Sequence, residues 1–286
     1  MASAARLDLV RASRALVTAT HAAPTATVTT VMTAFAVSVG RGFGGSVLVA
    51  AAVLSGQLSV GWSNDYLDRF RDAEVGRHDK PIPSGAVGAS TVRTAAAIAL
   101  LACVVLSLAN GWRAGLVHLA GVAAAWAYNL RLKATWLSPL PYAIGFGALP
   151  AFVVLGLPGH PGPPAWLVAG GALLGLGAHF ANVLPDLEDD LATGIVGAPH
   201  HLGRTGTASA SAGLLLAATV CLSLGPTGGS RLLTIGGLVL AVVLVAGGAA
   251  AVLRQGAQGS ATMFRVSMVL AVLDVGLLLG RGGGVG

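Results

Sequence analysis

NDYLDRFRD at residues 64–72 and NVLPDLEDD at residues 182–190 repeat one pattern, in which an asparagine is followed by aspartates four and eight positions later. A glycine lies four residues after each final aspartate, and a proline lies five residues after that glycine. Nine of the eleven acidic residues fall within 65–79 or 186–190. A chain that gathers its carboxylates in two repeated stretches is expected to use them for chemistry.

The composition excludes an ordinary soluble domain. The chain has 286 residues, of which 55% are hydrophobic and 10% are charged, whereas a soluble domain is about 25% charged. Too few polar residues remain to cover the surface, so the solvent of this protein is a bilayer. The two cysteines, Cys103 and Cys221, lie in apolar runs, which favours small core residues over a disulfide or a metal site.

Apolar stretches long enough to cross a bilayer, about 20 residues each, recur nine times. The sequence therefore predicts an all-α, polytopic membrane protein, a bundle of about nine transmembrane helices in a single domain over residues 1–286. Arg6, Arg11 and Arg14 precede the first stretch without a following cleavage site, so this stretch is expected to be a retained helix, kinked at Pro24. The predicted helices lie near 15–39, 44–70, 91–109, 113–130, 138–157, 165–190, 207–224, 232–253 and 262–280.

Glycines and charges along these helices predict how the helices pack and how they are oriented in the membrane. Glycines such as Gly171 and Gly175 are expected at close contacts between helices. With nine spans and the N-terminus inside, thirteen of the 17 Lys and Arg residues fall on one side of the membrane and four on the other. By the positive-inside rule, the N-terminus and both aspartate stretches face the cytoplasm, and the net charge of +6 needs no nucleic-acid partner. The repeated motif, offset by 118 residues (182 − 64), suggests two related halves.

The spacing of the aspartates places them on helix faces. A helix turns about 100° per residue, so positions i, i+4 and i+8 drift only about 40° per step. Asn64, Asp68 and Asp72 are expected to share one face at the cytoplasmic end of the helix near 44–70, and Asp65, three residues before Asp68, joins that face. On the helix predicted near 165–190, the residues expected to share a face are Asn182, Asp186 and Asp190.

Carboxylates crowded near a membrane repel one another and need a cation. Their hard oxygens suit Mg²⁺, which proteins hold through one or two carboxylates together with substrate phosphate and water. Two facing clusters would hold Mg²⁺ with a diphosphate between them. The alternative, ordinary pairing with Arg and Lys on a solvated face, is disfavoured by the repeated register. The nearby basic residues expected to take the remaining phosphate charge are Arg77, Lys80, Lys133, and Arg204 or His200.

At these residues the sequence resembles the UbiA superfamily of intramembrane prenyltransferases. Residues 64–72 match that family's NDxxDxxxD motif, and DKPIPSG at 79–85 resembles its K-P-x-P-S-G continuation. Residues 182–190 are similar to the family's DxxxD motif. GIVGAPHHLG at 194–203 is similar to the ending of its menaquinone and homogentisate branches, and YNLRLK at 128–133 to its Tyr-x-x-x-x-Lys segment. The resemblance covers essentially the whole chain, and the double motif is specific.

The resemblance implies a nine-helix bundle around a central cavity. It also implies Mg²⁺-dependent transfer of a prenyl group from a polyprenyl diphosphate to an acceptor. Mg²⁺ and nearby bases withdraw charge from the leaving diphosphate, so that the allylic C–O bond ionises. By position, the implied diphosphate contacts are Arg77, Lys80 and Lys133, and the implied catalytic carboxylates are Asp68, Asp72, Asp186 and Asp190. The residues implied to bind Mg²⁺ are Asn64, Asp65, Asp68, Asp72, Asn182, Asp186 and Asp190.

The chain departs from the family pattern after the second motif, where Ala198 replaces a leucine and His200 is followed by His201. His179, one turn before Asn182, is expected to point into the bundle as a general base, an acceptor contact or a hydrogen-bonded structural histidine. Two interpretations of the aromatic residues stay open: a cavity wall that stabilises a carbocation, or ordinary packing and interfacial anchoring. The residues concerned are Trp62, Trp126, Tyr142 and Phe146.

Three functions fit these features. The leading one is prenyl transfer from a prenyl diphosphate to a small aromatic acceptor. A terpene cyclase of the UbiA type shares the fold and the ionisation step but has no separate acceptor, and the sequence shows no evident arginine pocket for a benzoate carboxylate. A transporter is disfavoured, because the carboxylates lie at helix ends rather than near the bilayer midplane, where transporter sites usually sit.

Overall fold

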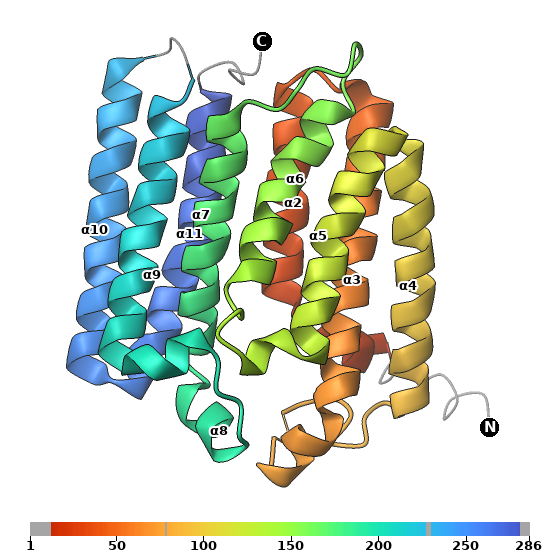
Figure 1. Cartoon of the computed structure of the whole chain (residues 1–286), viewed down its shortest axis with the longest axis vertical. Coiled ribbons are helices and arrows are strands. Elements are labelled where there is room, and N and C mark those ends of the chain that lie inside the picture. Colours follow the sequence, from red (N-terminus) through yellow and green to blue (C-terminus); the bar gives the residue numbers. More distant parts are fainter. Residues whose placement is uncertain (1–12, 78, 227–229, 281–286) are drawn as a thin grey trace.

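The computed structural model describes residues 13–77, 79–226 and 230–280, and every regular element in these residues is helical. The long helices stand side by side, from α10 at one edge of the bundle to α4 at the other (Figure 1). Two short elements, η1 (Leu132–Ala134) and α8 (Leu187–Ala192), follow α5 and α7. The long helices are α2 (Ala22–Ser38), α3 (Gly42–Glu74), α4 (Ala89–Ala109), α5 (Trp112–Leu130), α6 (Leu140–Leu155), α7 (Ala165–Val183), α9 (Ala198–Leu224), α10 (Arg231–Gln255) and α11 (Ala257–Leu279).

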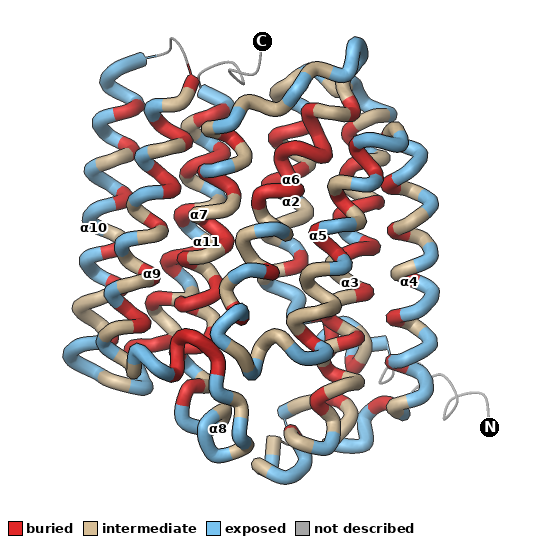
Figure 2. The backbone as a smooth tube through the Cα atoms, viewed as in Figure 1, coloured by how far each residue is buried: buried red, intermediate tan, exposed pale blue. Residues whose placement is uncertain are grey.

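The predicted all-α, polytopic architecture is confirmed. Each of the nine predicted stretches overlaps one long helix of the described chain, although α9 begins at Ala198, nine residues (207 − 198) before its predicted start at 207. Six of these helices are long and apolar enough to cross a membrane by length and composition, and α2 and α6 are apolar but shorter. Buried and exposed positions alternate around the helices (Figure 2). The exposed side chains include Ile98 and Val105 on α4 and Val239 and Val243 on α10, as expected for faces that contact lipid.

The first predicted stretch, 15–39, is not one continuous helix. Residues 13–18 are helical, a turn follows, and α2 begins at Ala22, after His21 with its left-handed backbone (φ 53°, ψ 61°). Pro24 therefore does not kink a helix interior, which corrects the prediction. It lies in the first turn of α2, where a missing N–H costs no intrahelical hydrogen bond.

Helices α6 and α7 approach each other closely because α7 presents glycines to α6. A Cβ atom on Gly175 would lie 2.4 Å from the carbonyl oxygen of Tyr142, and one on Gly171 would lie 2.6 Å from that of Phe146. Any side chain at these positions would push the two backbones apart, so the predicted contact role of the glycines is confirmed. The close packing lets Asn182 Nδ2 on α7 donate to Tyr142 Oη on α6 at 3.3 Å.

Away from the two aspartate stretches, the described helices bury one further carboxyl group, that of Asp274 on α11. It is 1% exposed, and neither oxygen has a hydrogen-bond partner in the described part of the chain. The hydroxyl of Thr219 lies beside it but donates to the Leu215 carbonyl oxygen at 3.3 Å. A cavity of about 60 Å³ adjoins Asp274. A buried polar group without a partner destabilises the fold.

We expect Asp274→Leu to stabilise the protein by about 1–3 kcal/mol, the cost of an unsatisfied buried polar group. The adjoining cavity leaves room for the larger side chain. The measurement is thermal unfolding in detergent, with Asp274→Asn as the control, because an amide keeps an unpartnered polar group at the site. An unfolding temperature of Asp274→Leu at or below that of the wild type would contradict the interpretation.

Candidate active site

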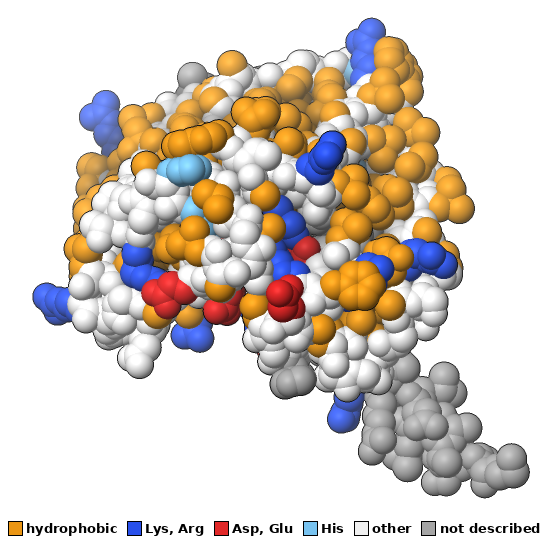
Figure 3. Space-filling model, turned by 60° about the horizontal axis from the view of Figure 1, so that its bottom comes forward, with side chains coloured by type: hydrophobic (Ala, Val, Ile, Leu, Met, Phe, Trp, Pro, Cys, Tyr) orange, Lys and Arg blue, Asp and Glu red, His pale blue; other side chains and the backbone are white. Residues whose placement is uncertain are grey.

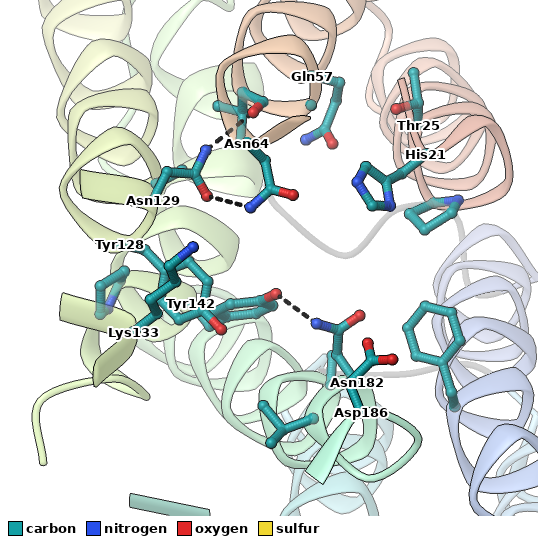
Figure 4. Close-up of a pocket in the computed structure, with 18 of the residues that line it drawn as sticks. His21, Thr25, Gln57, Asn64, Tyr128, Asn129, Lys133, Tyr142, Asn182 and Asp186 are labelled. Carbon is teal, nitrogen blue, oxygen red and sulfur yellow. Dashed lines mark hydrogen bonds between the residues drawn. The ribbon is translucent and has the colours of Figure 1, made fainter. Parts of the chain in front are cut away.

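A cavity of about 680 Å³ lies between α2, α3, α5, α6, α7 and α11, toward the end of the bundle that carries loop 75–88 and α8. Side chains from these helices surround it and point toward its centre (Figure 4). Seen from that end of the molecule, the acidic side chains lie close together, and some of the basic side chains lie beside them (Figure 3). The two aspartate stretches, far apart in the sequence, therefore meet around one cavity.

The first stretch keeps the helical spacing on which its prediction rests, because α3 continues unbroken through residues 64–72. Asn64, Asp68 and Asp72 line the cavity, and the two aspartates are 8% and 5% exposed. Asn64 Nδ2 donates to Asp68 Oδ2 at 3.1 Å and lies 3.3 Å from Asn129 Oδ1 on α5. These hydrogen bonds orient the motif and connect it to the neighbouring helix.

The second stretch does not lie on one helix face, which corrects the prediction for residues 165–190. α7 ends before a turn at 184–186, and α8 begins after it. Pro185 lacks an N–H and its ring clashes with the carbonyl one turn earlier, so the helix does not continue. The turn redirects the chain, and α8 carries the last aspartate back to the cavity. The motif residues that line the cavity are Asn182, Asp186 and Asp190.

Arg71 pairs with carboxylates of both stretches. Its guanidinium lies 3.0 Å from Asp68 Oδ2, 3.9 Å from Asp72 Oδ1 and 3.6 Å from Asp190 Oδ1. The side chain is 24% exposed, so water screens these contacts only in part. One cation thus offsets the mutual repulsion of three carboxylates. The sequence prediction missed it, although a spacing of three residues from Asp68 on one helix is a recognised signal for an ion pair.

Lys133 and Arg77, two of the predicted diphosphate contacts, also line the cavity and pair with motif carboxylates. Lys133 Nζ contacts Asp68 Oδ1. Burial lowers the pKa of Lys133, and the neighbouring Asp68 opposes that effect. Arg77 Nη1 lies 3.3 Å from Asp186 Oδ1, and Arg77 Nε lies 3.0 Å from Asp79 Oδ1. The hydrogen bond with Asp79 is the main cause of a raised pKa at Arg77.

The oxygen donors around the cavity suit Mg²⁺ but do not form a complete metal cage. Within residues 13–77, 79–226 and 230–280, no three Asp, Glu, His or Cys side chains converge on one point. Instead, a basic side chain pairs with each of Asp65, Asp68, Asp72, Asp186 and Asp190, and Asp189 also lines the cavity. Mg²⁺ commonly takes one or two protein carboxylates and completes its shell with phosphate oxygens and water. The donor set therefore fits Mg²⁺ that is held jointly by the protein and a phosphate-bearing substrate.

Comparison with known proteins identifies the family in which this fold and these motifs occur together. The sequence profile of the UbiA prenyltransferase family matches residues 26–272. The chain belongs to the UbiA prenyltransferase family. It is therefore a multi-pass membrane protein of this family, which confirms the family and the fold class expected from the two motifs.

Two curated relatives show which branches of the UbiA family this chain is similar to. The bacteriochlorophyll synthase 33 kDa chain of Cereibacter sphaeroides is 36% identical over 171 residues, which cover 55% of each chain. Protoheme IX farnesyltransferase 2 of Natronomonas pharaonis is 34% identical over 156 residues, which cover 52% of this chain and 36% of the relative. The chain thus spans about half or less of the length of the curated relatives it matches.

A solved structure shows the same fold. The UbiA homologue from Archaeoglobus fulgidus bound to GPP and Mg²⁺ superposes with a TM-score of 0.65 at 14% sequence identity, covering 92% of this chain and 99% of that one. At this identity the likeness concerns the fold alone. It establishes that the helices described here are arranged as in other UbiA proteins.

Among the histidines and arginines near the second stretch, only some reach the cavity of this UbiA protein. His200 lines it, with Nε2 3.4 Å from Asp190 Oδ2. Arg204 is not in the described lining and pairs with Glu188 at 2.8 Å. His179 is fully buried, and its Nε2 lies 3.1 Å from a serine hydroxyl. This geometry favours the hydrogen-bonded structural histidine over a general base.

The aromatic residues divide between the two interpretations. Tyr142 and Phe146 line the cavity. Trp62 and Trp126 are not in the described lining, and their indole N–H groups donate to a carbonyl oxygen at 3.0 Å and a serine hydroxyl at 3.3 Å. His201 stacks on another tryptophan ring at 3.9 Å. Ordinary packing therefore accounts for the two tryptophans.

Some cavity residues were not predicted. Tyr128 and Asn129 begin the segment 128–133, in which only the lysine was singled out. Gln57 lies two turns before Asn64 on α3, and His21 precedes α2. The helical period was a usable signal for Gln57. For His21 no spacing signal exists, because its position depends on a turn.

We expect Arg71→Gln to lower the stability of the protein in EDTA by about 2 kcal/mol. A fully buried ion pair that loses one partner costs about 3–5 kcal/mol, and the partial exposure of Arg71 reduces this. Addition of Mg²⁺ and pyrophosphate should restore most of the loss, because Mg²⁺ then offsets the carboxylates. Thermal unfolding measures both effects. Arg69→Gln is the matched control, because Arg69 stacks on Tyr66 and Phe70. An equal loss of stability with and without Mg²⁺ and pyrophosphate would contradict the role of Arg71 as the cation that offsets the carboxylates.

Proposed function

We propose that this UbiA protein transfers a prenyl group from a Mg²⁺-bound prenyl diphosphate to a flat aromatic acceptor, at the cytoplasmic end of its bundle. The observation that carries the proposal is the meeting of two acidic motifs around one cavity, together with the basic side chains that a diphosphate needs. Asp68 and Asp72 reach the cavity from α3, and Asp186 and Asp190 reach it from the turn after α7 and from α8.

The carboxylates and basic residues would act together on the leaving group. Bound Mg²⁺ supplies Lewis-acid stabilisation of the charge that develops on the diphosphate. Asp68 and Asp186, each a proposed metal ligand, are also the partners of Lys133 and Arg77. When substrate binds, the ammonium and guanidinium groups exchange these carboxylates for diphosphate oxygens, to which they make charge-assisted hydrogen bonds.

Ionisation breaks the bond between the allylic carbon and the diphosphate oxygen, and the electron pair leaves with the diphosphate. Hydrogen-bond donors that are already in place when this charge develops stabilise the transition state more than the ground state. We assign this stabilisation of the transition state to Arg77, Lys80 and Lys133. The acceptor then forms the new bond to the allylic carbon and releases a proton.

The prenyl chain would lie along the apolar wall of the cavity. Val28 of α2, Val122 of α5, Leu149 of α6, Leu174 of α7 and Ala271 of α11 contribute to that wall. Burial of apolar surface is worth about 25 cal/mol per Å² and has no directional preference. Burial of apolar surface would thus hold the prenyl chain, and the diphosphate end would fix its position along the cavity.

Two observations support a flat aromatic acceptor. Tyr142 and Phe146 present nearly parallel rings, 12° apart with centroids separated by 6.2 Å, and Tyr128 meets Tyr142 edge-on at 5.3 Å. Aromatic side chains arranged in this way suit contact with another ring system. The curated relatives are named for bacteriochlorophyll and protoheme IX, which are tetrapyrroles. A tetrapyrrole is therefore the acceptor to test first.

The cytoplasmic placement is proposed from charge. The cavity end of the bundle carries Arg71, Arg77, Lys80, Lys133 and Arg204, and the ends of helices on the opposite side carry Arg41, Arg113 and Arg231. Basic residues concentrate on the cytoplasmic side of membrane proteins. The active site would therefore open where water-soluble diphosphates are available.

The test uses purified protein in detergent with Mg²⁺ and, separately, geranyl, farnesyl and geranylgeranyl diphosphate. Pyrophosphate release and extracted products are measured without an acceptor and then with a chlorophyllide, protoheme IX, hydroxynaphthoate, hydroxybenzoate or homogentisate. We expect pyrophosphate release that depends on one of these aromatic acceptors. A cyclic hydrocarbon formed without any acceptor would replace transfer with terpene cyclisation, and no pyrophosphate in any mixture would overturn the proposal.

We expect Asp68→Ala and Asp186→Ala each to lower turnover at least about 100-fold, the usual cost of losing one group that stabilises a developing charge. Both variants should remain folded in detergent, which size-exclusion chromatography checks. Glu188→Gln is the matched control: this acidic residue belongs to the same stretch but lies outside the described lining and pairs with Arg204. Wild-type turnover in either alanine variant would refute the metal-site assignment.

A further inference from the structure

Asp65 differs from the other polar residues of the first motif in the direction it faces. Because a helix turns about 100° per residue, it lies about 100° from Asn64 and about 60° from Asp68 around α3. It is 2% exposed and is not among the described lining residues, whereas Asn64, Asp68 and Asp72 are. Its oxygens are therefore separated from those that face the cavity.

Lys80 is the first partner of Asp65. Its Nζ donates to Asp65 Oδ1 at 2.7 Å, and the lysine side chain is 16% exposed. Lys80 lies in loop 75–88 and lines the cavity. A lysine side chain has many rotamers, and a buried charge-assisted hydrogen bond removes most of that freedom. Asp65 thereby fixes where this ammonium group lies at the rim of the cavity.

His21 is the second partner. Its Nε2 lies 3.6 Å from the same Oδ1 atom of Asp65, and its side chain is 47% exposed. His21 lines the cavity on the α2 side, across from Tyr128 and Lys133 (Figure 4). One buried carboxylate thus contacts two nitrogen donors that both reach the substrate cavity but belong to different segments of the chain.

The backbone of His21 is strained, and neighbouring contacts maintain the strain. A left-handed conformation is uncommon for a residue other than glycine, and such strain concentrates at functional sites. The Thr25 hydroxyl donates to the Thr20 carbonyl oxygen at 2.8 Å, which closes the turn around His21. A Cβ atom on Gly61 of α3 would lie 2.9 Å from that same carbonyl oxygen. The turn is therefore seated on α3, next to Asp65.

We propose that Asp65 is a positioning residue rather than a metal ligand. It holds Lys80 and His21 at the rim of the cavity, and His21 is a further contact for the diphosphate of the substrate. This inference rests on the proposed function for the identity of the anion. It changes the role expected for Asp65 from metal binding to positioning. It also adds His21, which lies outside both motifs, to the site.

The test separates metal binding from diphosphate binding. Mn²⁺ and inorganic pyrophosphate serve as probes, titrated calorimetrically into detergent-solubilised protein, and the kinetic constants for prenyl diphosphate are measured in parallel. The variants are Asp65→Asn, His21→Asn, their combination, and Asp68→Asn as the metal-site reference. Asparagine suits position 21 because it tolerates a left-handed backbone. His160→Asn is the matched control, since His160 is also left-handed (φ 48°) but is not in the described lining.

We expect Asp65→Asn to weaken pyrophosphate binding and raise KM for prenyl diphosphate about tenfold, the effect of losing one charge-assisted hydrogen bond. Its Mn²⁺ affinity should stay within about twofold of the wild type, whereas Asp68→Asn should lose Mn²⁺ affinity. The kcat of Asp65→Asn should also fall, because Lys80 is assigned to the charge that develops on the leaving diphosphate. His21→Asn should raise the same KM about threefold, and the double variant should be no worse than Asp65→Asn, because residues acting as one unit are not additive. His160→Asn should change nothing.

A loss of Mn²⁺ affinity in Asp65→Asn comparable with that in Asp68→Asn would overturn the inference. So would unchanged pyrophosphate binding in His21→Asn, including the case in which only the KM for the acceptor rises. If Asp65→Asn does not fold, His21→Asn and Lys80→Gln decide the question, since both leave the carboxylate in place. The calorimetric titrations need no turnover, so a wild type without prenyltransferase activity would refute the proposed function while the Mn²⁺ comparison still tests Asp65.

Discussion

Repulsion among carboxylates at one end of an apolar bundle is the constraint on which the rest of the structure depends. Five aspartates from two distant stretches approach one cavity, where a low local dielectric makes an unpaired charge costly. The basic side chains that offset them come from different elements: Arg71 from α3, Arg77 and Lys80 from loop 75–88, and Lys133 from η1. The same ion pairs therefore hold the loops over the cavity and place the bases where a diphosphate would bind.

The break after α7 matters as much as the motif itself. In an unbroken helix, Asp190 would lie about 12 Å further along the axis than Asn182, at a rise of about 1.5 Å per residue, as Asp72 does from Asn64 on the continuous α3. Pro185 ends the helix, and α8 returns Asp190 to the cavity, where it meets Arg71. Glycines in α7 position the first residue of the second stretch, because they let Asn182 reach Tyr142 on α6.

What the sequence predicted and what it missed follow from the range of the interactions involved. Helix positions and the shared face of Asn64, Asp68 and Asp72 depend on apolar length and the helical period, which one chain segment contains. The break at Pro185 was missed because the repeated spacing was given more weight than the local effect of a proline. The direction of Asp65 follows from the same helical period, which was not applied to it in full. Its contacts with Lys80 and His21 were missed because these residues lie on a loop and a turn that are distant in the sequence.

The ion pairs also explain why metal and diphosphate would bind together. In the described part of the chain, six aspartates line the cavity against four Lys and Arg side chains, and Asp65 pairs with one of these from outside the lining, so the site carries excess negative charge by itself. A diphosphate alone would add negative charge to carboxylates that are already crowded. Mg²⁺ alone would take carboxylates away from Lys133 and Arg77. Arg77 would keep Asp79, but Lys133 would be left unpaired in a region where unpaired charge is costly. Binding of both would offset this charge, because carboxylates would contact the metal while the freed basic groups would contact the phosphate oxygens.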